Sequence, residues 1–171
     1  MKKMTALTSF ALFTLPAHAD YKKRDIRLHD CPASVQKTIS NHARGLRVKE
    51  VEYIRVEEQT VYIAEIRIEK GRDLEIFVNG QGALLKTSEE LRIHKLPQTV
   101  LSAARAMGGK IDDVEKVTRK GSVVTYEVEI DRKKGFKDLD VVFSPSGRSL
   151  LCKNFDRTCN SLLQFLNIYG F

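Results

Sequence analysis

Two related segments decide the fold: YIAEIRIE at residues 62–69 and YEVEID at residues 126–131. In each of them apolar residues alternate with charged residues. This period of two is typical of a β-strand that buries one face and exposes the other to water. We therefore expect an antiparallel sheet that is covered on one face and open on the other.

The alternating segments belong to a longer internal repeat, because the chain matches itself at an offset of 63 to 65 residues. Each copy begins with a proline, Pro32 or Pro97, and continues with apolar residues at the three-to-four spacing of an amphipathic helix. The helices are expected to end near Gly45 and Gly108. Four strand-like segments follow in each copy, at 48–54, 62–69, 74–78 and 84–85 and at 111–117, 126–131, 139–143 and 150–151.

The sequence therefore predicts an α+β protein of two tandem units, each with one helix and a four-stranded antiparallel sheet. Units of roughly 55 residues are close to the lower limit for independent folding, so the two are expected to pack together or to share sheet edges. The expected division is a signal peptide at 1–19, an N-terminal segment at 20–30, a first repeat at 31–86, a connector at 87–95, a second repeat at 96–151 and an apolar C-terminal tail at 152–171. The tail is expected to dock on the second unit.

The first nineteen residues have the three parts of a secretion signal. Lys2 and Lys3 precede an apolar stretch at residues 4–15, and AHA at residues 17–19 matches a cleavage site. The apolar stretch is shorter than the ~20 residues that a membrane-spanning helix needs. We therefore expect a periplasmic or secreted protein with no transmembrane segment after cleavage.

The charge of the chain is mildly basic. It has 171 residues, 30% of them charged, and a formal net charge of +7. Loss of Lys2 and Lys3 with the signal would leave 27 basic and 22 acidic residues, a net charge of +5. The basic runs at 21–24, 118–120 and 132–134 are separated by acidic strands, so nucleic acid is not an expected partner.

The three cysteines, Cys31, Cys152 and Cys159, all lie in the expected mature chain. An oxidising compartment permits one disulfide and leaves one thiol free. Cys152 and Cys159 could close a small loop, or Cys31 could pair with either of them. The sequence leaves these pairings open.

The sequence contains no pattern typical of catalysis or of cofactor binding. There is no G-x-S-x-G motif, and SPSG at residues 144–147 falls where a hairpin turn is expected. The carboxylate pairs at 57–58, 89–90 and 112–113 place neighbours on opposite faces of a strand. The cysteines and histidines lack the spacing of metal ligands. We expect a protein that is not an enzyme and has no cofactor and no metal.

The repeated pattern resembles the tandem PepSY-like domain family, which is related in fold to the secreted β-lactamase-inhibitor protein. The first copy departs from it, with Cys31 in place of a leucine before the proline and YIAEI at residues 62–66 for the tyrosine strand. The second copy carries the resemblance more clearly, in LPQTV at 96–100, GGKI at 108–111, VEKV at 114–117, YEVEI at 126–130, LDVVF at 139–143 and GRSLL at 147–151. The resemblance implies a small non-catalytic binding or inhibitory module that uses its open sheet face and turn loops.

The expected partner is a protein of the cell envelope, for example an enzyme that is inhibited or modulated by contact with the open sheet face. The expected contact residues occupy the wetter strand positions and the turns: Glu65, Arg67, Glu69, Asn79, Gly80, Glu127, Glu129, Asp131 and Arg148.

An alternative function is that of a small-ligand or envelope-stress carrier. Its pocket would lie between helix and sheet, around the aromatic residues Tyr62, Phe77, Tyr126 and Phe143.

Overall fold

A nine-stranded antiparallel sheet, with its strands in chain order, and two α-helices make up the computed structural model, which describes residues 21–56, 58–133 and 136–154. The strands are β1 (Tyr21–Ile26), β2 (Val48–Val56), β3 (Gln59–Glu69), β4 (Arg72–Asn79), β5 (Leu84–Glu90), β6 (Lys110–Arg119), β7 (Val123–Asp131), β8 (Leu139–Phe143) and β9 (Ser149–Asn154). The helices are α1 (Ala33–His42) and α2 (Gln98–Ala106), with short 3₁₀ turns η1 (Leu28–Asp30), η2 (Ile93–Lys95) and η3 (Lys120–Ser122).

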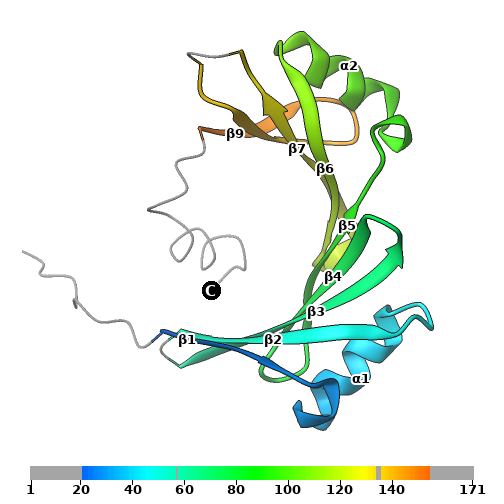
Figure 1. The fold of residues 1–171 in the computed structure, drawn as a ribbon, viewed down its shortest axis with the longest axis vertical. Helices are drawn as coiled ribbons and strands as arrows, with labels where there is room; N and C mark the ends of the chain where they lie inside the picture. The colour runs from blue at the N-terminus through cyan, green and yellow to red at the C-terminus, as the bar shows by residue number, and fades with distance from the viewer. Residues whose placement is uncertain (1–20, 57, 134–135, 155–171) are drawn as a thin grey trace, which may run out of the picture.

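The sheet is bent into an arch, and both helices lie on its outer side (Figure 1). We call the face that the helices cover the outer face and the opposite one the inner face. Each helix begins directly after the proline that the sequence singled out, Pro32 or Pro97. A proline suits this position because its missing N–H would have no partner within the helix.

Two apolar cores fill the space between the helices and the outer face. In the first core Val35 and Ile39 of α1 are buried against β2, β3 and β4, and in the second Val100 and Ala104 of α2 are buried against β6, β7 and β8. The buried strand residues of the first core are Val51, Tyr62, Ala64, Ile66, Leu74, Ile76 and Val78. Those of the second are Ile111, Val114, Val128, Ile130, Val141 and Phe143. The apolar halves of the two alternating segments therefore face the helices.

The α+β class is confirmed, but two separate four-stranded units are not what the structure contains. Strands β5 and β6 pair over five residues, from Lys86↔Arg119 to Glu90↔Glu115, and so join all the strands in one sheet. Residues 87–90, expected in a connector, lie within β5 for the same reason. A polar segment can be a strand here because β4 and β6 satisfy its backbone on both sides.

Strand β1 was not expected from the sequence. It pairs with β2 from Tyr21↔Val56 to Ile26↔Val51 and forms one edge of the sheet. Its charged sequence, YKKRDI, hides the strand signal. Charged residues are common on edge strands, where they oppose pairing with other chains. The expected signal peptide at 1–19, Cys159 and most of the apolar tail lie outside the described residues.

Two β-turns that contain glycine pack closely against the N-terminal ends of the two helices. The β4–β5 turn contains Gly82 (φ 87°), where a Cβ atom would lie 2.6 Å from the Cβ of Ser34. The β8–β9 turn contains Gly147 (φ 82°), where a Cβ atom would lie 2.5 Å from the backbone oxygen of Thr99. The Thr99 hydroxyl also donates a hydrogen bond to the carbonyl of Pro145 (2.8 Å). These turns therefore require glycine both for their backbone angle and for the close approach.

Replacing Gly147 by alanine should destabilise the protein more than replacing Gly108. Both glycines have positive φ, which costs an alanine about 1 kcal/mol. At Gly147 the new methyl group would also collide with the backbone of α2. At Gly108 it would not, because nothing lies within 4 Å of a Cβ atom there. Chemical denaturation should show a free energy of unfolding lower for G147A than for G108A by at least about 1 kcal/mol. Equal losses would mean that the turn does not dock on α2 as described.

Candidate functional site

The inner face of the sheet is the surface that neither helix covers, and its residues follow from the strand pairing. Residues opposite each other in paired strands share a face. One row of such partners runs Asp25, Glu52, Ile63, Phe77, Lys86, Arg119 and Val123. The next runs Glu50, Glu65, Glu75, Ser88, Val117 and Thr125. A third runs Glu90, Glu115, Glu127, Val142 and Leu151.

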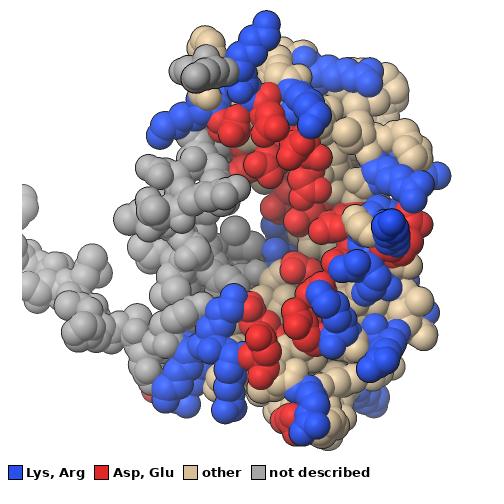
Figure 2. Space-filling model, in the orientation of Figure 1, with Lys and Arg blue, Asp and Glu red and all other residues tan. Residues whose placement is uncertain are grey.

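Acidic side chains dominate this face. Figure 2 shows them gathered along the hollow of the arch, with Lys and Arg mostly toward its rims and outer side. By register the acidic residues are Asp25, Glu50, Glu52, Glu65, Asp73, Glu75, Glu90, Glu115, Glu127, Glu129 and Asp140. The basic residues with described side chains are Lys23, Lys86, Arg119 and Arg67, together with Lys49, which reaches Glu65 from the β2 bulge. Among the described side chains, eleven acidic against five basic residues give this face a formal charge of −6, although the whole chain carries +7.

The centre of the inner face holds a small cavity of about 220 Å³ where β4, β5 and β6 meet. Its lining is Glu65, Asp73, Glu75, Ser88, Glu90 and Glu115. Ser88 is 2% exposed, and its hydroxyl donates a hydrogen bond to the carboxylate of Glu115. The backbone N–H of Asp73 donates to Glu90 (2.9 Å). The cavity therefore lies where the β5–β6 pairing joins the two halves of the sheet.

Two basic residues and one aromatic ring lie in the row of the sheet next to the cavity. The ammonium group of Lys86 lies 4.3 Å from the centre of the Phe77 ring, a cation–π contact. The Arg119 guanidinium donates to the Thr125 hydroxyl (2.8 Å) and to the Glu127 carboxylate (3.2 Å). These contacts hold positive charge on one side of the acidic cluster.

Burial shifts the pKa of the central ionisable groups toward their neutral forms. Burial, reinforced by the neighbouring Glu115 carboxylate, raises the pKa of Glu75 to about 7. Burial also raises the pKa of Glu115, although the Ser88 hydrogen bond opposes the rise. Burial lowers the pKa of Lys86, against the attraction of Glu127 and Glu115. Near neutral pH the charge at the centre of the face therefore depends on pH.

Around the cavity, ion pairs order the acidic side chains. Lys49 contacts Glu65 at 2.6 Å, and the hydrogen bond from Lys49 lowers the pKa of that carboxyl. Arg67 binds Asp73 with two guanidinium nitrogens, one of them at 3.0 Å. Lys23 contacts Glu52 at 2.5 Å. Such exposed pairs contribute little stability, but they fix the positions of the carboxylates.

Four of the expected contact residues share the inner face: Glu65 and Arg67 on β3, and Glu127 and Glu129 on β7. Burial and the nearby Asp140 raise the pKa of Glu129. The alternation in the sequence was sufficient to place these four residues together.

The other expected contacts lie at the ends of strands or in turns. Glu69 is at the β3–β4 hairpin, where it pairs with Arg72 (2.8 Å) and with Arg92. Asp131 is the last residue of β7. Asn79 is the last residue of β4, where its side chain accepts hydrogen bonds from the backbone N–H groups of Gln81 and Ala83. Gly80 and Arg148 lie in turns, where their N–H groups donate to Thr60 and Ser144. The structure therefore does not bring these five residues onto the centre of the inner face.

The aromatic residues of the alternative ligand pocket do not surround a common space. Tyr62 packs in the first core, while Tyr126 and Phe143 pack in the second. Phe77 lies on the inner face, paired with Ile63 and Lys86. The sequence placed them together because all four are strand aromatics. Only Tyr126 and Phe143 are partners in the strand register, whereas Tyr62 lies in the other core and Phe77 on the opposite face.

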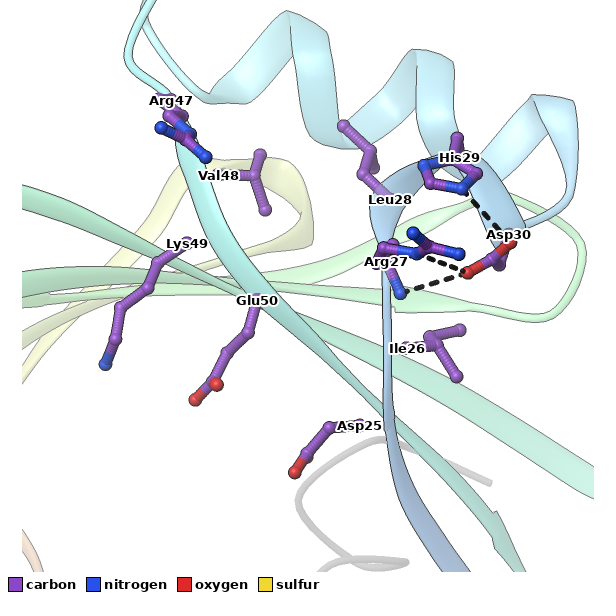
Figure 3. A pocket seen from close by; sticks show the side chains of 10 residues that line it. All are labelled: Asp25, Ile26, Arg27, Leu28, His29, Asp30, Arg47, Val48, Lys49 and Glu50. Carbon is purple, nitrogen blue, oxygen red and sulfur yellow. Dashed lines mark hydrogen bonds and ion pairs between the residues drawn. The ribbon is translucent and has the colours of Figure 1, made fainter.

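A groove of about 550 Å³ lies where β1 and η1 diverge from the start of β2 (Figure 3). Its apolar part, formed by Ile26, Leu28 and Val48, packs against the first core. Figure 3 shows Lys49 and Glu50 projecting away from the helix side, toward the inner face. None of the four expected aromatic residues lines this groove.

The cysteines contribute no disulfide within the part of the chain that the structure describes. Cys31 is a free thiol, 5% exposed in the first core, and burial raises its pKa. Cys152 is a free, exposed thiol on β9. The expected pairings with Cys159 fall outside the described residues.

Within residues 21–56, 58–133 and 136–154, His, Cys, Asp and Glu form no group of three or more that could hold a metal ion. In the same residues, no helix has the length and apolar character required to cross a membrane.

Comparisons with known proteins support the fold. No family model and no curated protein matches the chain. A DUF2874 family protein from Bacteroides uniformis has 21% sequence identity and a TM-score of 0.63, covering 77% of this chain and 95% of that chain. A protein from Bacteroides eggerthii, provisionally described as periplasmic, has 16% identity and a TM-score of 0.62, covering 77% and 94%. A BLIP-like protein from Bacteroides fragilis has 22% identity and a TM-score of 0.59, covering 76% and 92%.

The BLIP-like fold expected from the resemblance is thus confirmed, whereas membership of the PepSY-like family stays a prediction. Several residues at the centre of the inner face were not expected as functional: Glu75, Lys86, Ser88, Glu115 and Arg119. One signal was present, because Glu75 is a single acid inside the apolar strand sequence LEIFV at 74–78. An isolated charge in a buried strand is unusual and often functional.

The raised pKa of Glu75 predicts a pH-dependent stability. Its carboxyl ionises near 4.5 in the unfolded chain and near 7 in the folded protein. The stabilising contribution of the protonated form is therefore complete below pH 4.5 and is lost as the pH rises through about 7. Relative to Glu75→Gln, the wild-type free energy of unfolding should fall by up to about 3 kcal/mol across this range.

Urea denaturation between these pH values measures the effect. Glu58→Gln, which changes an exposed carboxylate in the β2–β3 turn, is the matched control and should retain the wild-type profile. Parallel pH profiles for the wild type and Glu75→Gln would contradict the assignment.

Proposed function

We propose that this chain is a non-catalytic binding module of the cell envelope, which contacts another protein through the inner face of its sheet. The observation that carries the proposal is the continuous helix-free face, on which half of the acidic residues of the chain are concentrated. Acidic residues of a soluble domain are ordinarily dispersed over its surface. Their concentration in the hollow of the arch favours an interaction role.

The location in the envelope has two independent supports. The sequence begins with the three parts of a secretion signal. A protein of similar fold is provisionally described as periplasmic. Exported binding modules meet their partners in the same compartment, so we propose an envelope protein as the partner, with an enzyme inhibited or modulated by the contact as the specific case.

The chemistry of the inner face favours binding over catalysis. Its carboxylates contact lysine, arginine and serine side chains of neighbouring strands. The described histidines, His29, His42 and His94, lie in η1, α1 and η2 and not on the strands. The Ser88 hydroxyl does lie within hydrogen-bond reach of the Glu115 carboxylate, but Ser88 is only 2% exposed, so this hydroxyl is poorly placed to attack a substrate. The geometry therefore suits recognition by charge and shape.

Site-specific photo-crosslinking in living cells tests the proposal. A photoreactive residue would replace Ile63 or Val142 on the inner face and, as matched controls, Lys37 or Ser40 on the exposed side of α1. Both inner positions should crosslink to the same envelope protein, and the α1 positions should not, because a specific interface occupies only one patch of the surface. Capture of that protein at the α1 positions instead would overturn the proposal, as would no crosslinks from either inner position.

A further inference from the structure

The inner face has a charge opposite to that of the molecule as a whole. The described side chains of the face carry a formal −6, whereas the chain without the expected signal peptide carries 27 minus 22, or +5. The remaining residues therefore carry a large positive excess. A partner with a basic surface would be attracted to the hollow and repelled elsewhere, so the charge pattern selects both the partner and its orientation.

The acidic residues form lines across the strands. Glu50, Glu65 and Glu75 are successive partners on β2, β3 and β4. Glu90, Glu115 and Glu127 are successive partners on β5, β6 and β7. Neighbouring strands lie about 4.8 Å apart, so each line presents carboxylates at a short and regular spacing. An extended cationic segment that crosses from the first line to the neighbouring second line would meet an acidic group on each strand from β2 to β7.

The cavity between these two lines has the size of a side chain. Its volume of about 220 Å³ is below the ~300–1,000 Å³ typical of small-molecule pockets. Five carboxylates and the Ser88 hydroxyl line it. A lysine ammonium or an arginine guanidinium offers several hydrogen-bond donors and no acceptor, which matches a lining made of acceptors.

Resting on the proposed function, we infer that the partner presents a cationic segment, rich in lysine or arginine, to the inner face, and that one of its basic side chains enters the cavity at the β4–β5–β6 junction. The other basic side chains contact the acidic lines on both sides of the cavity. Lys86 and Arg119 lie one row away from the lining of the cavity. Within the lining, Glu65 and Asp73 already contact Lys49 and Arg67, so the incoming cation would be bound mainly by Glu75, Glu90 and Glu115.

Such binding is linked to the release of a proton. Glu75 faces Glu65 on β3, Lys86 and Ser88 on β5 and Glu115 on β6, with Glu52 on β2 also acting on it. In the free protein its pKa is about 7. A cation in the cavity favours the ionised carboxylate, so affinity should increase as the pH rises through 7.

The C-terminal residues 155–171 would be an alternative occupant of the face, and their composition bears on this alternative. They follow β9 directly and are rich in apolar residues, but they contain a single acidic and a single basic residue, Asp156 and Arg157. Their near-neutral charge gives them no electrostatic preference for the inner face. The charge pattern therefore favours a separate cationic partner.

Binding of defined peptides to the protein purified from the exported fraction tests the inference. The probe is a peptide that alternates lysine with threonine, and its glutamate–threonine counterpart is the control. Fluorescence anisotropy should show binding of the lysine peptide alone, weakening as salt is added because exposed charges are screened. Between about pH 6 and about pH 8 affinity should rise about tenfold, since the ionised fraction of Glu75 rises from about one tenth to nine tenths.

Two variants locate the binding surface. Glu75→Gln should remove the pH dependence, and Glu50→Lys, at an exposed position of an acidic line, should weaken the lysine peptide several-fold. The matched control is Asp112→Lys, which makes the same change of charge in a depression beside Leu101 and Arg105 of α2. Equal weakening by Glu50→Lys and Asp112→Lys would show a response to net charge only and would overturn the inference.

The peptide experiment and the crosslinking experiment fail in different ways. If the inner positions capture an envelope protein but the crosslinked segment is neutral or acidic, the cationic partner is wrong and the proposed function stands. If the inner positions crosslink only to residues 155–171 of the same chain, both the cationic partner and the proposed function are wrong. Lysine-peptide binding that is lost in Glu50→Lys, together with a basic crosslinked segment, supports both.

Discussion

The pairing of β5 with β6 is the interaction on which the rest of the molecule depends. It joins two helix-covered halves, each with its own apolar core, into one sheet. Because both helices lie on the outer side, the two helix-free faces merge into one surface along the arch. Ser88 and Glu115 illustrate the consequence, since they come from different halves and form a hydrogen bond at the centre of that surface. Without this pairing the acidic lines would end at two separate sheet edges.

The sequence predicted the parts of the fold that depend on local periodicity. Pro32 and Pro97 marked the helix starts, and the alternation at 62–69 and 126–131 identified the strands and their helix-facing sides. It did not predict β1 or the continuation of β5 to Glu90, because both segments are rich in charged residues. Their strand structure comes from hydrogen bonding to neighbouring strands, which a local pattern does not encode. Pairing with neighbouring strands, and not the local sequence pattern, therefore determines that these two segments are strands.

The residues of the candidate site also fall into two groups, those that local periodicity predicts and those that depend on strand pairing. Glu65, Arg67, Glu127 and Glu129 could be predicted because each alternates with core residues in a regular strand. The central residues could not, because Glu75 comes from β4, Lys86 and Ser88 from β5, and Glu115 from β6. Register shifts within β2–β3, β3–β4, β4–β5 and β6–β7 further change which residues meet. A one-residue shift moves a side chain to the other face, so only the pairing itself shows that these four residues form one cluster.

The charged groups at the centre of the inner face lower the stability of the folded protein, and this cost is relevant to their function. Burial shifts the pKa of Glu75, Glu115 and Lys86 toward the neutral forms, so each charge is less stable here than in water. Apolar residues of similar volume at buried charged positions often stabilise a protein. Thr125 and Val117, which are buried on the same face, show that smaller or apolar side chains are accommodated there. The cost of these charges is what the proposed cationic partner would offset, since a bound cation would reduce the repulsion between Glu75 and Glu115 that destabilises the free protein.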